Sequence, residues 1–582
     1  MIPALGAASE EGYEDRLEKW GLELQGRERD PNPEGKIVDQ ILVSSENIVA
    51  PTDPYPKILN AVHVKTREGV IKREVLLQPG DRYDPDVAAE SERNLRGLFI
   101  LAAVRVVPAK SERPDHVDIL VVTKDLWSIR LNTQINTVGS LVQLLRVTPT
   151  EQNFLGRNQQ LSLDFLMLLD TISLGQAFTD PRLFGTRLRL SETAAIILNR
   201  STGKSEGSRG AIDFGQPLYS LATERAFDIA GSWQIYRSRT YRGADVQELP
   251  FPDPVNPTGT VPKIYDSKQV QGEASYTRSY GRRFKTDVSA GIGAYTHRYT
   301  APLDLGLTDE QRAWLVSNYL PRSEDAVYLT AGISFYRADW VVLRNIQTFA
   351  LSEDYRLGPA IFFVLRYAEP GLGSSLRFLE GGTTLRYRFY ERDDLFTATL
   401  SAGARFLPLG SIADQTSALV NRRVAAEIVN YSPVIGPGRF ALRGLVDIRA
   451  QDLNHHQMLL GGGNGLRGVA AEALVGTRSL LFNFEYRTKP LEFHTLHIGG
   501  VLFWDAGTVW DPADPNNSSP SLIHTVGIGF RGLLPQFDTA TFRVDLGFVL
   551  NGPAPSSFLD RVSTSFGQVF DYRPGFFGFP ID

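Results

Sequence analysis

Runs of alternating apolar and polar residues recur along the chain after about residue 126. Alternation with period two places successive side chains on opposite faces of a β-strand. In the run 126–136, the side chains of Trp127, Ile129 and Leu131 share one face, and the residues between them are polar or charged. Later runs at 284–292, 396–405 and 541–548 repeat the pattern. Each run is about 9–12 residues long, which is the length of a tilted strand that crosses a bilayer.

A soluble β-sandwich would also alternate, so the charges decide between the two architectures. They recur on the face opposite the apolar one, as expected for strands with lipid on one side and a wet lumen on the other. We therefore predict a mainly β protein, with a transmembrane antiparallel β-barrel of about 16 strands over residues 126–582. The strand candidates slightly exceed sixteen because the region 140–221 can be divided in more than one way. A single-chain bacterial barrel requires an even number.

Composition supports this fold class. The 582 residues suit a small domain followed by a large barrel. We find no uninterrupted apolar stretch of about 18 residues, so no transmembrane helix is expected. The 52 glycines, 32 phenylalanines and 21 tyrosines suit strands, turns and aromatic girdles. The net charge of -5 argues against a nucleic-acid partner.

The chain has no cysteine, which excludes disulfides, cysteine-based zinc sites and a thiol nucleophile. Its first residues have neither a basic region nor a long apolar core, so we do not expect an intact signal peptide. If the protein is exported, this numbering is expected to start at or near the mature end.

Two segments precede the predicted barrel. Residues 1–33 form an acidic, proline-punctuated lead-in that we expect to be loosely ordered or docked on another element, with a short helix over 11–24. Residues 34–125 have the pattern of a small α/β domain in the order strand, helix, helix, strand, strand. Thr66 is a candidate cap for its first helix, and Asp84 followed by Pro85 suits the start of the second.

A glycine-rich loop around Arg467 lies within residues 450–475, between predicted strands. Two alternating runs follow the arginine, at 476–487 and 501–510. Glu485 and Asp505 both fall on the non-apolar face of these runs. The planar guanidinium can serve two carboxylates at once, so we predict that Arg467 folds against Glu485 and Asp505.

Several motifs together resemble the BamA/TamA-type outer-membrane assembly-factor superfamily, which includes two-partner secretion transporters. Residues 36–125 are similar to a single POTRA domain, and 153–156 to an early-barrel turn. The remaining motif residues are Gly462, Gly463, Gly465, Leu466 and Gly468 in the loop, Phe503, Trp504 and Gly507 in the next strand, and Gly567, Phe570 and Tyr572 in a C-terminal assembly signal. Two features depart from the family pattern. Val469 stands where an aromatic residue is usual, and only one POTRA-like domain is visible.

The resemblance implies an outer-membrane factor that inserts or translocates unfolded or β-strand protein clients, with its POTRA-like domain in the periplasm. Its expected partners are the outer-membrane bilayer, unfolded protein clients, and periplasmic or lipoprotein partners bound through the POTRA-like domain. The resemblance places Arg467 in the lumen as a clamp, and a conformational switch is compatible with that role. The alternative is a passive outer-membrane pore or anchoring barrel that handles no clients.

Two routes for a client remain open. In the first, the strands 127–136 and 563–572 meet at a seam that parts, so that a client strand adds to the exposed edge. In the second, the client threads the lumen. The edge of the strand at 100–107 could also bind unfolded client, or could simply pack within its own domain.

Other residues give no sign of catalysis. His455 and His456 lack an obvious third metal ligand, and Asp393 with Asp394 suits a turn better than an acid/base pair. No serine, histidine and aspartate arrangement has a recognisable signature, and the glycine-rich loop precedes no helix. We therefore predict no enzyme activity, no metal and no cofactor, with a surface enzyme as the remaining alternative.

Overall fold

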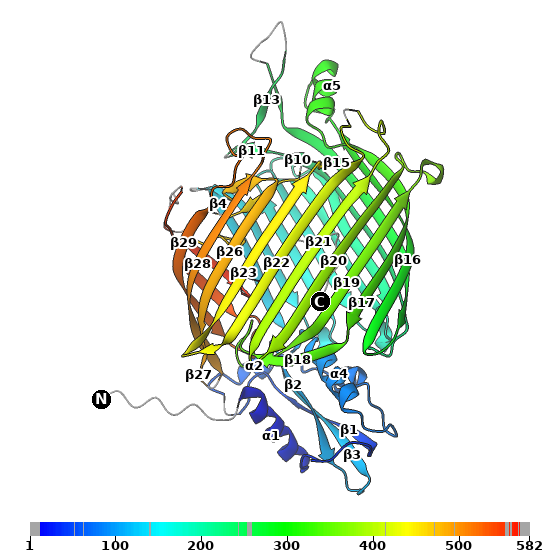
Figure 1. The fold of residues 1–582 in the computed structure, drawn as a ribbon, viewed down its shortest axis with the longest axis vertical. Helices are drawn as coiled ribbons and strands as arrows, with labels where there is room; N and C mark the ends of the chain where they lie inside the picture. The colour runs from blue at the N-terminus through cyan, green and yellow to red at the C-terminus, as the bar shows by residue number, and fades with distance from the viewer. Residues whose placement is uncertain are drawn as a thin grey trace, which may run out of the picture.

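A small N-terminal domain is attached to one end of a large β-barrel in the computed structural model (Figure 1). The other end of the barrel carries long loops. The structure describes residues 12–568 and 570, except 52, 62, 139–140, 243, 253–258, 414, 455, 471, 494, 553–557 and 559–560. Within these residues, every helix is too short or too polar to cross a membrane.

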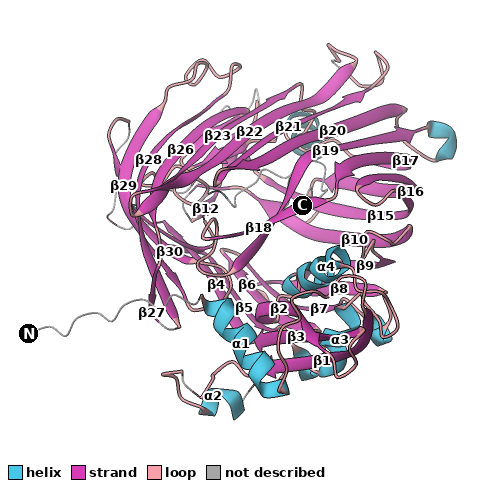
Figure 2. Cartoon of the chain, turned by 60° about the horizontal axis from the view of Figure 1, so that its bottom comes forward, coloured by secondary structure: helices cyan, strands magenta, loops and turns pink. Residues whose placement is uncertain are grey.

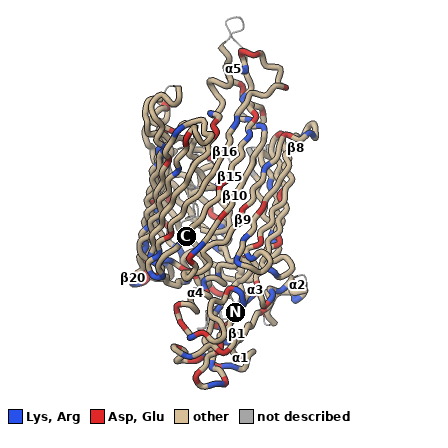
Figure 3. The backbone as a smooth tube through the Cα atoms, turned by 90° about the vertical axis from the view of Figure 1, so that its right-hand side faces the viewer, with Lys and Arg blue, Asp and Glu red and all other residues tan. Residues whose placement is uncertain are grey.

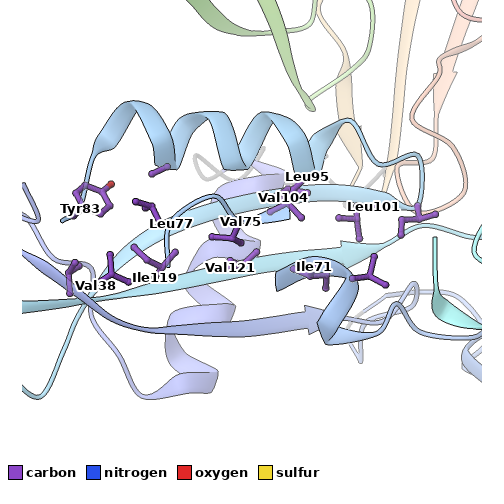
Figure 4. Packing of buried hydrophobic residues seen from close by; sticks show 14 residues of the cluster. Val38, Ile71, Val75, Leu77, Tyr83, Leu95, Leu101, Val104, Ile119 and Val121 are labelled. Carbon is purple, nitrogen blue, oxygen red and sulfur yellow. The ribbon is translucent and has the colours of Figure 1, made fainter. Parts of the chain in front are cut away.

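The N-terminal domain packs helices against a three-stranded sheet. Strand β3 lies in the middle, parallel to β1 and antiparallel to β2. Apolar side chains from α3, α4 and the sheet form one core, including Ile71, Leu95 and Val121 (Figure 4). The elements are α1 (Tyr13–Gln25), β1 (Ile37–Glu46), α2 (Ile58–Ala61), α3 (Glu68–Glu74), α4 (Pro85–Arg96), β2 (Leu101–Lys110) and β3 (His116–Asp125).

The two expected helix caps differ in outcome. The Asp84 carboxylate accepts hydrogen bonds from the Asp86 and Val87 amides, and Pro85 opens α4 as expected. The prediction for Thr66 is wrong. Arg67 rather than Thr66 precedes helix α3, and the Thr66 hydroxyl instead accepts from the Asn153 side-chain amide at 2.9 Å.

The second half of the outer edge of β2 is covered within the domain. The Asp30 amide donates to the Pro108 carbonyl at 2.9 Å, and the Lys110 amide donates to the Glu28 carbonyl at 2.8 Å. The Val106 amide donates to the Glu92 carboxylate at 2.8 Å. Residues of the lead-in therefore pair with this edge, and α1 packs on the domain beside it.

The barrel is closed and antiparallel, and twenty-two strands of the described residues take part in it. Strand β18 continues the register of β17, and β27 continues β26 across a one-residue shift, so twenty strands form the wall. Their bounds are β4 (Ile129–Val138), β5 (Leu141–Glu151), β6 (Gln160–Leu168), β7 (Thr171–Asp180), β8 (Arg189–Asn199), β9 (Ser205–Gln216), β10 (Arg225–Arg239), β15 (Ile264–Tyr280), β16 (Phe284–Thr300), β17 (Glu324–Arg337), β18 (Asp339–Arg344), β19 (Ser352–Ala368), β20 (Phe378–Glu391), β21 (Asp394–Phe406), β22 (Leu419–Ile435), β23 (Gly438–Ala450), β26 (Arg478–Thr488), β27 (Leu491–Phe493), β28 (Leu496–Trp510), β29 (Ile523–Leu533), β30 (Phe542–Val549) and β31 (Val562–Phe566).

The predicted count of about 16 strands is therefore too low. The ambiguous region 140–221 forms five strands, β5 to β9, joined by short connections. Two of these connections contain single-turn 3-10 helices, η1 (Phe154–Gly156) and η2 (Leu183–Gly185). Turns of this kind have no periodic sequence signal, so alternation alone merges the strands on either side of them.

The two faces of the barrel wall separate as the alternation predicts. On β26 and β28, the side chains of Phe482 and Trp504 are exposed on the outside, while Asn483 and Asp505 are buried on the inside. The fold is thus a transmembrane barrel with an apolar outer belt and a polar interior.

The last strand is shorter than expected. β31 ends at Phe566, and Gly567 adopts a φ of +84°, which turns the chain out of the strand direction. Phe570 is buried against Tyr431, with 6.1 Å between ring centroids, among residues of the barrel interior. The prediction of a last strand over 563–572 is therefore wrong, and Phe570 is not part of a terminal strand. Tyr572 lies outside the described residues.

The long loops lie at the end opposite the N-terminal domain (Figure 1). The connection 302–324 contains one helix, α5 (Asp309–Asn318), which starts with a capping box formed by Thr308 and Gln311. The connection 240–263 forms two small hairpins from β11 (Tyr241–Arg242), β12 (Asp245–Val246), β13 (Glu248–Pro250) and β14 (Thr260–Pro262).

Candidate functional site

The glycine-rich loop between β23 and β26 folds against the inner face of the barrel. It begins with β24 (Met458–Leu460) and ends with β25 (Leu474–Gly476), which pair with each other. Between them, the side chains of Leu466 and Val469 are buried against Leu481 and Val509. These apolar contacts fix the loop against the inner face of β26 and β28, so the Arg467 side chain lies beside the barrel wall. Val469, the departure noted in the sequence, is part of this core.

Arg467 contacts both predicted carboxylates. Its Nε and Nη2 donate to the two oxygens of Asp505 at 2.8 and 2.7 Å, a bidentate arrangement. Its Nη1 donates to Glu485 Oε1 at 2.5 Å. All three side chains have 0% exposure. The structure thus brings the loop arginine onto the two carboxylates that the alternation placed on one face.

Two further residues hold this geometry. The Asn483 amide donates to the Gly465 carbonyl and to Asp505 Oδ1, each at 2.7 Å, and so ties the loop backbone to the carboxylate. The Phe503 ring lies under the guanidinium, with 3.6 Å from Cζ to the ring centroid. Phe503 therefore faces the lumen, whereas its neighbour Trp504 is exposed on the outer face and stacks on His524.

The arginine cluster is larger than the sequence predicted. Asp545 of β30 lies 3.6 Å from Arg467 and accepts from Arg531 at 2.6 Å and Arg543 at 2.9 Å. Glu485 also accepts from Arg487 Nε at 2.6 Å. The signal for Asp545 was present, because it alternates with the apolar residues of its strand and so had to face inward. Nothing in the sequence, however, placed β30 beside the loop.

Close backbone approach explains the position of one loop glycine. Gly468 has a φ of +84°, and a Cβ there would lie 2.7 Å from the backbone carbon of Gly547 on β30. In the reverse direction, a Cβ on Gly547 would lie 2.6 Å from the Gly468 nitrogen. Two facing glycines therefore allow the loop to touch the wall. Gly463, by contrast, has open space where a Cβ would be.

A second element fills the mouth of the barrel at the end where the N-terminal domain lies. Strand β18 and the start of β19 leave the wall and cross inside the ring of strands (Figure 2). Their connecting tip, residues 345–351, packs Phe349, Ala350 and Leu351 against Leu533 on the far wall. We call residues 339–352 the mouth hairpin.

The tip of the mouth hairpin is held around one carboxylate. Glu353 accepts hydrogen bonds from the amides of Ile346, Gln347 and Thr348 at 2.9 to 3.1 Å, and from the Tyr355 hydroxyl at 2.6 Å. Asn345 and Ala350, at the two ends of the tip, both have positive φ. The hydrogen bonds to Glu353 therefore stabilise this conformation of the turn.

The mouth hairpin also contacts the N-terminal helix and domain. Glu14 of α1 accepts from the Ser352 amide at 3.0 Å and pairs with Arg344 at 3.1 Å. Arg96 of α4 forms a bidentate pair with Asp354 at 2.7 and 2.8 Å. These contacts tie a loop of the barrel to two elements of the N-terminal domain.

Helix α1 is fixed at this junction by its apolar face. Tyr13 and Leu17 are buried between the sheet of the N-terminal domain and the mouth hairpin. Burial, together with the carboxylates of Glu46 and Asp53, raises the pKa of the Tyr13 phenol well above its ordinary value. The phenol therefore stays neutral at physiological pH and serves as a packing group.

The early-barrel turn at 153–156 docks on the same domain. The Asn153 amide group donates to Thr66 Oγ1 at 2.9 Å, and the Arg67 amide donates to the Gly156 carbonyl at 3.0 Å. Gly156 has a φ of +69°, and a Cβ there would lie 2.4 Å from the Lys65 carbonyl oxygen. The motif therefore joins the first hairpins of the barrel to the N-terminal domain.

The rest of the lumen is polar and partly open. A cavity of about 690 Å³ lies against β9, β10, β15 and the facing strands. Its walls carry charges of both signs, including Asp228, Glu273, Arg366, Glu380 and Arg405. The lumen thus retains space away from the arginine cluster.

The remaining residues singled out in the sequence occupy loops. Asp393 follows Arg392 in the two-residue turn between β20 and β21, where both have positive φ, and Asp394 opens β21. His456 pairs with Asp452 at 2.8 Å, and His455 lies outside the described residues. The described residues contain no group of three or more histidines and acids suited to a metal.

Comparison with known proteins gives one family match. Residues 436–570 match the Omp85 superfamily domain. That range contains Arg467, Glu485, Asp505 and Asp545. No curated protein sequence matches the chain.

Solved structures align over most of the chain at low identity. CdiB from Escherichia coli aligns with a TM-score of 0.43 and 10% identity, covering 92% of this chain and 76% of CdiB. CdiB from Acinetobacter baumannii gives 0.36 and 13%, covering 92% and 73%. BamA from Haemophilus ducreyi lacking POTRA domains 1-3 gives 0.33 and 12%, covering 91% and 83%.

Proposed function

Residues 436–570 match the Omp85 superfamily domain and lie within an outer-membrane β-barrel, and from that match we propose that this protein inserts or translocates unfolded or β-strand protein clients. The observation that carries the proposal is the overlap between the family match and the buried arginine cluster. Arg467 and its three carboxylates all lie inside the matched residues. A cluster that fixes a loop inside the lumen sets the shape of the strands around it, which are the last strands of the barrel.

The seam between the first and last strands supports a lateral route. Within the described residues β31 has five residues, whereas its neighbour β4 has ten. β31 therefore spans at most half of the edge of β4. The uncovered part of that edge offers backbone groups to an incoming strand, which is strand addition at a barrel edge.

Ser563 links this seam to the loop. Its hydroxyl donates to the Gly462 carbonyl at 3.2 Å, so β31 is held from inside by the glycine-rich loop. In the proposed cycle, the loop holds the last strand in register at rest. Displacement of the loop then frees β31 to part from β4.

The mouth hairpin gives the N-terminal domain a means to act on the lumen. We assign the domain as a single POTRA domain that lies in the periplasm and receives clients or partner proteins. Its movement would act on the mouth hairpin through Arg96 with Asp354 and through Glu14 with Ser352. Both outer edges of the sheet are partly covered. The lead-in pairs with the end of β2, and residues 80–83 pair with the start of β1, so the remaining part of either edge is the candidate for client contact.

A passive pore is the alternative function, and the mouth hairpin argues against it. A conducting pore needs a continuous opening, whereas the hairpin tip here contacts the far wall at Leu533. Purified protein in a planar bilayer should therefore conduct poorly at rest. A large, steady conductance without client capture would favour the pore.

A cross-linking experiment tests client handling at the seam. A photo-reactive amino acid would replace Leu131 or Ile135 of β4, both exposed on the outer face. The matched control would carry it at Leu329 of β17, which is also exposed on the outer face, at 50%, but lies away from the seam. We expect a radiolabelled barrel precursor to cross-link at the two β4 positions and not at Leu329. Equal labelling at all three, or none, would contradict the proposal.

A further inference from the structure

A cleft on the outside of the barrel rim carries a group of arginines that the proposed function does not use. Its lining residues come from α3, from the two 3-10 turns η1 and η2 and the residues next to them, and from the end of β7. Its volume is about 650 Å³. Its lining includes four arginines and one carboxylate, that of Asp180. The arginines are Arg67, Arg73, Arg157 and Arg182.

The carboxylates at the cleft are already occupied. Asp180 accepts from Gln159 Nε2 at 2.7 Å. Glu74, which flanks the cleft, accepts from Arg182 at 2.6 Å and from Arg187 at 3.1 Å. Within the described residues, Arg73 and Arg157 contact no carboxylate, so two positive charges at this rim are left for an external anion. Charged segments of both signs occur elsewhere at this end of the molecule (Figure 3), but this cleft has a net positive lining.

The position of the cleft identifies the kind of anion. Phe178 lines it and shares the outer face of β7 with Leu174, which is 48% exposed. Phe184 of the second turn also lines it and is 91% exposed. Apolar rings therefore stand on the lipid side of the cleft, and guanidinium groups stand at the rim. This is the arrangement that a phospholipid requires, with acyl chains beside the rings and a phosphate beside the arginines.

We propose that this cleft binds the headgroup phosphate of an anionic phospholipid from the leaflet on the N-terminal-domain side. Arginine suits the role because its planar fork binds phosphate oxygens bidentately. The lipid would contact α3 of the N-terminal domain and both barrel turns at once. Bound lipid would thus fix the domain against the barrel at this side. The inference rests on the membrane location of the barrel and does not depend on client handling.

A titration of the full-length protein in detergent tests the site. Short-chain phosphatidylglycerol, short-chain phosphatidylcholine and inorganic phosphate would be compared by isothermal titration calorimetry. We expect Arg73→Gln with Arg157→Gln to weaken phosphatidylglycerol binding by about 10-fold or more. The matched control is Arg282→Gln with Arg392→Gln. These two exposed arginines lie on other turns at the same end of the barrel, and their loss should change binding less than about two-fold.

The other ligands separate a lipid site from simpler explanations. Phosphatidylcholine should bind more weakly, and phosphate should compete only at much higher concentration. Phosphate that competes at the lipid's own concentration, equal binding of phosphatidylcholine, or equal loss in the control variant would each overturn the proposal. Unchanged heat-modifiability on gels would show that each variant barrel is folded. Phe184→Ser should weaken phosphatidylglycerol binding and leave phosphate binding unchanged.

Discussion

Arg487 donates from Nε to Glu485 at 2.6 Å and from Nη1 to the Ile346 carbonyl at 3.0 Å. One side chain therefore connects the buried arginine cluster to the tip of the mouth hairpin. Through Glu485 the connection reaches Arg467, and through the hairpin it reaches α1. The loop that holds the seam and the hairpin that fills the mouth are thus neighbours in a single polar network.

The first prediction concerns this connection. Arg487→Ala should loosen the mouth hairpin, because a buried carbonyl and a buried carboxylate each lose a charged donor, at a cost of about 1.5–3 kcal/mol per hydrogen bond. Hydrogen exchange at residues 345–351 should rise, and conductance in planar bilayers should increase. The control is Arg189→Ala, which removes a lumenal arginine paired with Asp213 on another part of the wall. An equal rise in the control would show that any lost lumenal charge has this effect.

The second prediction concerns Arg467 itself. Arg467→Ala leaves Asp505 and Glu485 buried without their shared partner, and breaking a buried pair in this way costs about 3–5 kcal/mol. We expect the glycine-rich loop to leave the wall and client assembly to fall sharply. Exchange protection of β3 should be unchanged, because the N-terminal domain has its own core. Arg467→Lys should also fail, since one ammonium cannot make the bidentate contact and reach Glu485. Wild-type assembly in either variant would contradict the clamp.

Alternation correctly predicted which side chains of a strand face the lumen and which face outward. It placed Glu485 and Asp505 on the inner face, and the barrel wall has apolar side chains outside as expected. It did not fix the strand count, because the turns at 154–156 and 183–185 put Leu155 and Phe184 at positive φ and leave one glycine each, Gly156 and Gly185, as the local turn signal in a chain with 52 glycines. Leucine and phenylalanine do not signal a turn, and a lone glycine within a strand-like run is a weak signal.

Contacts between segments far apart in the chain could not be predicted from the sequence, for a different reason. The mouth hairpin begins directly after β17 and continues its pairing register on β19, so nothing local indicates that it leaves the wall. Its position depends on Glu353 binding the turn amides and on Glu14, more than three hundred residues away, binding Ser352. Phe570 likewise matched a terminal-strand motif by residue type, yet the φ of Gly567 directs it inward.

The third prediction is that alanine has different effects at two glycines of the same loop, Gly468 and Gly463. Gly468→Ala would place a Cβ 2.7 Å from the Gly547 backbone at a φ of +84°, so loop and wall must separate. We expect a loss of about 1–3 kcal/mol in loop docking, which is typical of overpacking, together with reduced client assembly. Gly463→Ala is the matched control, because its Cβ would meet open space. Limited proteolysis of the loop would measure the difference, and equal sensitivity of the two variants would contradict close packing at Gly468.

The fourth prediction concerns the carboxylate that shapes the hairpin tip. Glu353→Gln removes the negative charge that three backbone amides and the Tyr355 hydroxyl share, and its amide nitrogen cannot accept their hydrogen bonds. Hydrogen bonds to charged groups contribute about 1.5–3 kcal/mol each, so the tip should open far more often than in the wild type. Exchange at Ile346, Gln347 and Thr348 should rise by at least about ten-fold, since each 1.4 kcal/mol corresponds to a factor of ten.

The control for this variant is Glu369→Gln, just beyond the other end of the same strand, where the carboxylate pairs with Arg377 at the surface. It should leave exchange at the tip unchanged. If the mouth hairpin restricts access to the lumen, Glu353→Gln should also raise bilayer conductance, and Glu369→Gln should not. Faster exchange at the tip without any change in conductance would show that the tip opens locally while the hairpin stays across the mouth. In that case the N-terminal domain would have to act on β18 and β19 as a whole, through Arg96 and Asp354, and the Arg96→Ala variant would be the one that conducts.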